Sequence, residues 1–193
     1  AFSRDGKFIL TGSDDKTAKV WPRKGGDPVT FTGHRDHLTS VAFSRDGQFI
    51  LTGSADGTAK VWPRKGGDPV TFAGHEYITS VTFSPDDRFI LTGGGFAQTA
   101  KLWPREGGDP LTLSGHTPVI TSVAFSPDSR YILTGSADGT AKVWLNLFWG
   151  WEHGLIWKNV HKLTDNQRDE YDIDAFWDYD YFSLWSSAES EKL

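Results

Sequence analysis

The stretch ILTGSADGTAKVW occurs twice in the chain, at residues 50–62 and at residues 132–144. A second stretch, VWPRKGGDPVTF, also occurs twice, at residues 20–31 and 61–72. A fixed period is typical of repeat proteins, in which one small unit cannot bury its apolar face alone and stacks on copies of itself. Four tryptophans show that the period is 41 residues: Trp21, Trp62, Trp103 and Trp144.

Each period contains four short apolar runs separated by turn residues. In the second repeat these runs are TSVAFS (39–44), FILTG (49–53), TAKVW (58–62) and VTF (70–72). The connections contain Asp-Gly and Gly-Gly pairs, which favour tight turns. Pro63 ends the third run because proline has no N–H to donate to a strand ladder. No run follows a helical period, so the pattern predicts four antiparallel strands per repeat and an all-β fold.

Other short motifs recur in phase with the tryptophans. Gly-His at residues 33–34, 74–75 and 115–116 precedes Ser-Val-x-Phe-Ser, and Thr-Gly-Ser-x-Asp-Gly-Thr and Lys-Val-Trp follow. In this combination the chain resembles the WD-repeat (WD40) β-propeller family, with highly regular repeats of the bacterial type, over about residues 1–147. The resemblance implies that each period is one propeller blade of four antiparallel strands.

The resemblance also implies a role for the recurring polar residues. In this family a His, a Ser or Thr, an Asp and the Trp form a buried hydrogen-bonded chain that ties the outer strands to the inner ones. Such buried groups are tolerated only when they are fully hydrogen-bonded. We interpret the sets as structural rather than catalytic, because they recur in successive repeats. The matching residues are His34, Thr52, Asp56 and Trp62; His75, Thr92 and Trp103; and His116, Thr134, Asp138 and Trp144.

Three features depart from the family pattern. The third repeat has GGGFAQ at residues 93–98 where the others have Gly-Ser-x-Asp, so its set lacks the aspartate. The first repeat has Thr11, Asp15 and Trp21 but no preceding Gly-His, because the chain begins inside the first strand. The Asp that follows the Trp in the family is replaced in every repeat, by Pro22, Pro63, Pro104 and Leu145.

Composition excludes several classes of function. The chain of 193 residues has no Cys and no Met, which excludes disulfides and thiolate chemistry and indicates a processed or partial chain. No apolar run approaches the ~20 residues of a membrane span, and no secretory signal opens the chain, which favours a cytoplasmic location. Residues 1–144 carry 16 Lys and Arg against 15 Asp and Glu. This nearly neutral balance gives no support to a nucleic-acid partner.

The number of repeats raises a question of closure. The chain supplies about four blades, and closed propellers use about four to eight. Open blade faces and strand edges promote association. We therefore expect a fragment of a larger propeller, an incomplete ring that other copies complete or continue, or an open end capped by the rest of the chain.

The end of the chain does not follow the repeat. LNLFWGW (145–151) predicts the outer strand of the fourth blade, and residues 145–193 carry 4 Lys and Arg against 10 Asp and Glu. We interpret residues 148–193 as an acidic, aromatic tail that caps the blades or docks into a groove, with an abnormal terminus as a third alternative. Its secondary structure stays open, because helix and strand signals both occur in it.

One loop differs between otherwise uniform repeats, directly after each Gly-His. By resemblance to the family this loop lies on the top face, where partners dock. Variation confined to one edge of a regular scaffold is what a binding surface would show, although loops without a function also vary. Candidate partner-binding residues are Arg35, Asp36, His37, Glu76, Tyr77, Phe96, Thr117 and Pro118, of which Arg35, His37, Tyr77 and Phe96 are the expected anchors.

Basic turns are expected on the opposite face. They read RKGGD at residues 23–27 and 64–68 and REGGD at residues 105–109. We interpret them as solvated hairpin tips, with an electrostatic contact to an acidic segment as the alternative.

No Gly-rich phosphate loop, metal cluster or unrepeated acid–base pair appears, so we expect no enzyme, cofactor, metal, membrane contact or small-molecule substrate. The sequence predicts a non-enzymatic scaffold or sensor module that binds a protein partner, copies of itself included. For repeats this regular, the resemblance implies the sensor end of a larger signalling or defence protein. The alternative function is a structural subunit whose incomplete propeller is completed or polymerised by other copies.

Overall fold

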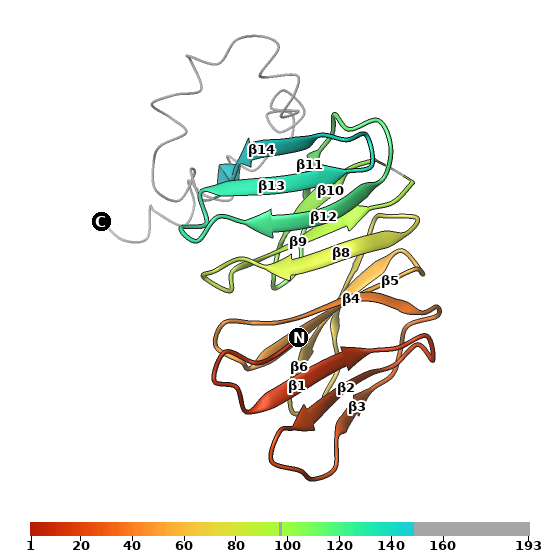
Figure 1. Ribbon diagram of the computed structural model, residues 1–193, viewed down its shortest axis with the longest axis vertical. Coiled ribbons are helices and arrows are strands. Elements are labelled where there is room, and N and C mark those ends of the chain that lie inside the picture. Colours follow the sequence, from red (N-terminus) through yellow and green to blue (C-terminus); the bar gives the residue numbers. More distant parts are fainter. Residues whose placement is uncertain (97, 149–193) are drawn as a thin grey trace, which may run out of the picture.

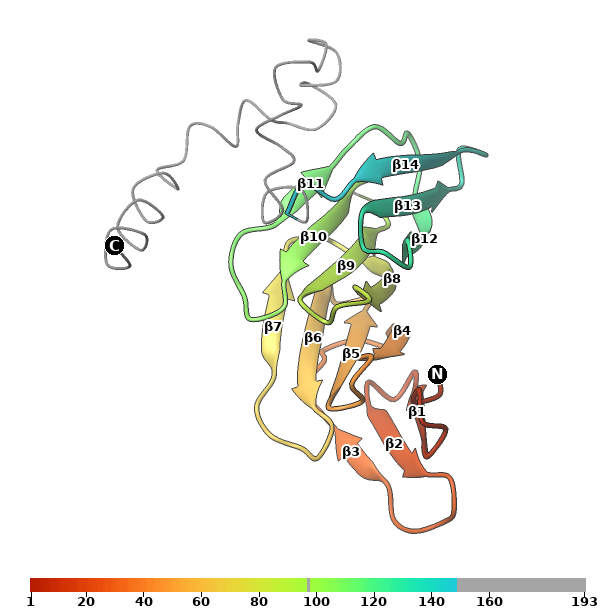
Figure 2. The ribbon, with the colours of Figure 1, turned by 90° about the vertical axis from the view of Figure 1, so that its left-hand side faces the viewer.

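The structure is a computed structural model that describes residues 1–96 and 98–148. Within these residues every named strand belongs to one of four antiparallel sheets. The sheets follow one another in chain order and stack face to face (Figures 1 and 2). The predicted all-β fold of antiparallel blades is confirmed, and the fold is an incomplete β-propeller.

The two middle sheets have all four strands that the repeat predicts. The second contains β4 (Leu38–Phe43), β5 (Phe49–Ser54), β6 (Thr58–Pro63) and β7 (Val70–Ala73). The third contains β8 (Ile78–Phe83), β9 (Phe89–Gly94), β10 (Ala100–Pro104) and β11 (Leu111–Leu113). Both have the same register, with Ile50 opposite Trp62 and Ile90 opposite Trp103.

The two end sheets have three strands each. The first contains β1 (Phe8–Gly12), β2 (Ala18–Pro22) and β3 (Val29–Phe31), and its innermost strand is reduced to one bridge between Phe2 and Ile9. The fourth contains β12 (Ile120–Phe125), β13 (Tyr131–Ser136) and β14 (Ala141–Leu145). Its outermost strand is absent among the described residues.

The predicted outer strand at residues 145–151 is wrong for the part that the structure describes. β14 ends at Leu145, and Leu147 and Phe148 pack against the apolar cluster between the third and fourth sheets. The ring of Phe148 stacks on that of Phe89, with centroids 5.3 Å apart. Stacked aromatic rings stabilise a structure beyond the apolar area that they bury. The rest of the predicted tail, residues 149–193, lies outside the described residues, as does Ala97.

A blade between two others buries both faces of its sheet against its neighbours. The face toward the following blade, here called the leading face, carries Leu51 and Val61 in the second blade. The face toward the preceding blade, here called the trailing face, carries Ile90 and Trp103 in the third. These four side chains meet in one apolar cluster, and equivalent clusters lie between the first and second and between the third and fourth blades. Burying each such side chain stabilises the fold by about 2 kcal/mol.

The connections lie on two opposite edges of the stack. The histidine edge, on the right of Figure 1, holds the loops that enter β4, β8 and β12 and the turns between the second and third strands of each blade. The diglycine edge, on the left, holds the turns that follow β2, β6 and β10 and contain Gly25-Gly26, Gly66-Gly67 and Gly107-Gly108. In the described part of the chain, no helix has the length and hydropathy that crossing a bilayer requires.

Candidate functional site

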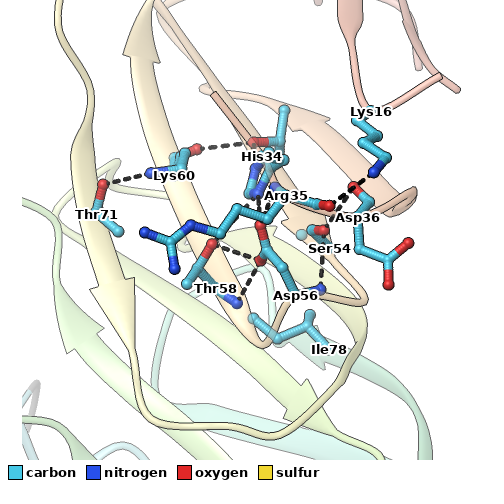
Figure 3. Close-up of polar contacts among 12 residues, drawn as sticks. Lys16, His34, Arg35, Asp36, Ser54, Asp56, Thr58, Lys60, Thr71 and Ile78 are labelled. Carbon is cyan, nitrogen blue, oxygen red and sulfur yellow. Dashed lines mark hydrogen bonds and ion pairs between the residues drawn. The ribbon is translucent and has the colours of Figure 1, made fainter. Parts of the chain in front are cut away.

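A buried hydrogen-bonded chain lies inside the second blade at the histidine edge. Thr52 on β5 is its centre: the indole N–H of Trp62 donates to Thr52 Oγ1 at 3.0 Å. On the other side His34 Nε2 lies 2.7 Å from the same oxygen. His34 Nδ1 lies 2.9 Å from Asp56 Oδ2 (Figure 3). The chain thus joins two strands, a turn and the loop from the preceding blade.

Asp56 is held in its ionised form. Partial burial raises the pKa of Asp56, but hydrogen bonds from the Thr58 hydroxyl and from the N–H groups of Arg35 and Thr58 outweigh burial and lower it to about 2. Burial lowers the pKa of His34 although Asp56 opposes it. A neutral imidazole beside a carboxylate carries its proton on Nδ1, so Nε2 accepts from the Thr52 hydroxyl. Every polar group of this set has a partner.

The fourth blade repeats this arrangement. His116 lies 2.8 Å from both Thr134 Oγ1 and Asp138 Oδ2, and the indole N–H of Trp144 donates to Thr134 at 2.9 Å. Hydrogen bonds, first that from the Thr140 hydroxyl, lower the pKa of Asp138. In the first blade Trp21 donates to Thr11 at 3.0 Å, and Asp15 accepts from the N–H and the hydroxyl of Thr17.

The third blade has an incomplete set. His75 Nε2 lies 2.8 Å from Thr92 Oγ1, and Trp103 donates to the same oxygen at 3.0 Å. His75 Nδ1 is buried and has no hydrogen-bond partner within the described residues. Burial, together with the charge of Lys101, lowers the pKa of His75 to about 4. The ring also needs Gly94, because a Cβ at that position would overlap it.

Phe96 stands where the second and fourth blades have their aspartates, and it points outward. It is 69 % exposed, and its ring meets that of Tyr77 edge to face at 6.1 Å. Tyr77 in turn meets His37 of the second blade at 6.3 Å. These three residues form a continuous aromatic row across the second and third blades, on the histidine edge.

The other candidate residues surround this row or lie beyond it. Arg35, Asp36 and Glu76 are exposed in the same two loops. Asp36 accepts from the N–H of His37 at 2.8 Å and from its ring at 3.1 Å, which orients the ring. Thr117 and Pro118 belong to the equivalent loop of the fourth blade, where the Thr117 N–H donates to Asp138. The structure therefore brings three of the four expected anchors together.

Sequence reasoning did not single out the hydroxyls that hold the carboxylates. Thr58 and Thr140 donate to Asp56 and Asp138 at 2.6 and 2.5 Å. Both threonines stand in the repeated Ser-x-Asp-Gly-Thr motif, so their recurrence was the available signal.

The arginines of the diglycine edge contact neighbouring blades. The Arg64 guanidinium lies 4.0 Å from the ring centre of Phe8, and that of Arg105 lies 4.5 Å from the ring centre of Phe49. Each such cation–π contact joins one blade to the preceding one. Lys24 and Lys65 at the tips of these turns are exposed.

The described residues, 1–96 and 98–148, contain no group of three or more His, Cys, Asp or Glu that could hold a metal ion. The recurring His and Asp side chains are used by the hydrogen bonds above.

A family model described as WD domain, G-beta repeat, matches four segments of the chain: residues 1–22, 27–63, 68–104 and 109–144. Each of the last three segments begins before the outermost strand of one sheet and ends with the third strand of the next. The matched unit is therefore offset from the blade by one strand. The first match, residues 1–22, is shorter than the other three and contains only β1 and β2. The last match ends within β14, the last strand of the described residues.

Proposed function

Because this chain belongs to the WD40 repeat family, we propose that it is a non-enzymatic scaffold or sensor module that binds a protein partner at the aromatic row of His37, Tyr77 and Phe96. Proteins of this family are generally non-catalytic modules that mediate protein–protein interactions.

The buried polar sets support a structural role rather than a catalytic one. Both ring nitrogens of His34 and of His116 are engaged by a Thr and an Asp of the same blade. A general base needs a nitrogen that can reach a substrate proton. These rings have none free for that purpose, so we assign the sets to the fold.

The observation that carries the proposal is the difference in the third blade. There the aspartate that would bind His75 is replaced by Phe96. Among residues 1–96 and 98–148 the buried Nδ1 of His75 then has no hydrogen-bond partner, and the large ring of Phe96 is exposed. Both features are unfavourable for folding. Such departures from local consistency are expected at functional positions, and a partner that covers the ring would offset them.

The surroundings of the row fit a protein ligand. Arg35, Asp36 and Glu76 supply charges of both signs around an apolar centre. Protein interfaces have this arrangement, with aromatic anchors inside and a polar rim outside. We infer that an apolar side chain of the partner packs on Phe96 and Tyr77, with polar groups of the partner at the rim.

A pair of variants tests this function. The triple variant His37→Ala, Tyr77→Ala, Phe96→Ala removes the row, and Lys24→Ala with Lys65→Ala alters the opposite edge as a matched control. A partner captured by the wild type, purified and titrated against each, should bind the triple variant at least about 30-fold more weakly and the control unchanged. Equal affinity for the triple variant would refute the proposal.

A second function is favoured by a separate observation, the exposure of apolar side chains on the end blades. Leu133 and Val143 of the fourth blade are 45 % and 63 % exposed. We propose as the alternative that the chain is a structural subunit whose incomplete propeller is completed or continued by other copies. In both cases we assign residues 1–147 to the repeat domain and residues 148–193 to a capping or docking tail.

A further inference from the structure

Large apolar side chains are exposed on one face of each end blade. On the first blade Phe2 pairs with Ile9, which in turn pairs with Trp21, so these three share the trailing face. On the fourth blade Leu133 pairs with Val143 and shares its leading face, because directly opposed residues project to the same side of a sheet. Phe2 is 70 % exposed and Trp21 38 %.

The same positions are buried wherever two blades meet within the chain. Leu51 and Leu91, which correspond to Leu133, are fully buried. Trp62 and Trp103, which correspond to Trp21, are each 5 % exposed. The two open faces are therefore the two halves of a contact that the molecule already makes three times.

We propose that the leading face of the fourth blade packs on the trailing face of the first blade of a second copy. This inference rests on the self-assembly proposed above and specifies its interface. The contact is head-to-tail, with different surfaces on the two copies, and such contacts form rings when the rotation closes. Two copies would supply eight blades, which lies at the upper end of the usual range for closed propellers.

A repeated arginine contact supports this pairing independently. Arg64 lies over Phe8 and Arg105 over Phe49, in each case an arginine of one blade on an aromatic ring of the preceding blade. At the third junction Asn146 replaces the arginine, and Phe148 stacks on the equivalent ring, Phe89. The end members of the series are Tyr131 on the fourth blade and Arg23 on the first. Tyr131 is 45 % exposed, and within the described residues neither side chain has a cation–π partner. In the head-to-tail contact Arg23 of the second copy would cover Tyr131.

The contact between copies is smaller than the contacts within the chain. In the third blade, Ile120 and Val123 on the innermost strand of the fourth blade lie directly over Gly93. Gly135 is the equivalent glycine of the fourth blade, and a Cβ built on it would contact only Thr121 of the same blade. The first blade has no such strand to offer beyond the bridge at Phe2. Association should therefore depend on concentration.

The first experiment measures mass by light scattering over a wide range of concentration. The wild type should reach at least twice its 21.4 kDa. The variant Leu133→Glu, Val143→Glu should stay monomeric, because it would bury two unpaired charges in the contact. Val29→Glu is the matched control, since this partly exposed valine lies on the leading face of the first blade, away from the contact. The control should assemble like the wild type.

A mixing experiment tests the head-to-tail geometry. Phe2→Glu with Arg23→Glu blocks the trailing face of the first blade and should also give a monomer. Mixing it with the Leu133→Glu, Val143→Glu variant should restore a one-to-one complex, because each variant keeps the surface that the other lacks. Circular dichroism should show that both variants fold.

The outcomes separate the interface from self-assembly itself. A wild type that stays monomeric at every concentration would overturn self-assembly and the interface together. A wild type and a fourth-blade variant that assemble equally would leave self-assembly standing and overturn this interface. Two monomeric variants that do not combine on mixing would overturn the head-to-tail arrangement.

Discussion

The second and third blades share the same strands and register, but they differ at the histidine edge. In the second blade Asp56 completes the chain from Trp62 through Thr52 to His34. In the third blade the chain stops at His75, and Phe96 is exposed where the carboxylate would be. The strands still form without the carboxylate, so the Trp–Thr–His part is enough for the blade. The third blade therefore forms without the aspartate of its set.

The largest expected effect concerns the threonine at the centre of each set. Thr52→Val would leave the Trp62 indole and the His34 ring without their shared partner, in a buried site. We expect a loss of about 3 kcal/mol of unfolding free energy, and about 2 kcal/mol for Thr92→Val, where the chain is shorter. Denaturant unfolding followed by circular dichroism measures both.

The control for this prediction is Thr71→Val, an exposed threonine that bonds only Lys60 in the described structure. It should change the unfolding free energy by less than about 0.5 kcal/mol. If Thr52→Val were equally mild, the buried chain would not hold the blade together.

The next effect is a dependence of stability on pH. The pKa of His75 is about 4 in the folded state against about 6.5 when unfolded, so the unfolded chain binds more protons between these values. Stability should therefore fall as the pH is lowered from 6.5 to 4, on the order of 2 kcal/mol from this residue. The contribution of Asp56, whose pKa is lowered to about 2, persists through this window and is lost only below about pH 4.

Comparing wild type with His75→Leu isolates the contribution of His75. The variant lacks the buried ring, so its unfolding free energy should decline less than that of the wild type over the same pH window. His34, whose pKa is also lowered, contributes to both curves alike. Parallel curves would show that His75 does not titrate as described.

A smaller effect separates the two histidines at neutral pH. His34→Leu removes a ring whose two nitrogens are both bonded, and it leaves Asp56 with fewer donors. His75→Leu removes a ring of which one nitrogen has no partner in the part of the chain that the structure describes. We expect the first change to cost about 1 kcal/mol more than the second, measured by denaturant unfolding. A greater loss from His75→Leu would reverse the comparison.

The smallest expected effect on stability is that of Phe96→Ser. The ring contacts Tyr77 but is mostly exposed, so unfolding should change by less than about 0.5 kcal/mol. Binding of the captured partner should nevertheless weaken about tenfold or more, as titration calorimetry would measure. Ser114→Ala, at another exposed position of the histidine edge, is the control and should bind as the wild type does.

The repeat period was enough to predict the four strands of each blade, because Asp-Gly turns, Gly-Gly turns and Pro63 mark the strand ends directly. Residues far apart in the chain were placed together only through the family pattern, since His34 and Asp56 are 22 positions apart. Once the residues of one set are known, the repeat period gives the equivalent residues of the other sets.

Other contacts could not be predicted, because the periodic pattern does not encode contacts between blades. The sequence suggested a basic surface at Arg64 and Arg105, whereas both guanidinium groups lie on rings of the preceding blade. It suggested an outer strand at residues 145–151, whereas Phe148 turns back onto Phe89. In both cases burial of an aromatic ring decided the outcome.

The most direct test of the central comparison is a loop exchange that converts the third blade to the second. GGGFAQ at residues 93–98 is replaced by GGADG, the loop of residues 53–57 with glycine kept at position 94 because a Cβ there would overlap the His75 ring. The exchange supplies an aspartate to His75 and removes Phe96. Our account predicts that the unfolding free energy rises by about 1 kcal/mol while partner binding is lost. A chain that is less stable after the exchange, or that binds its partner with unchanged affinity, would contradict it.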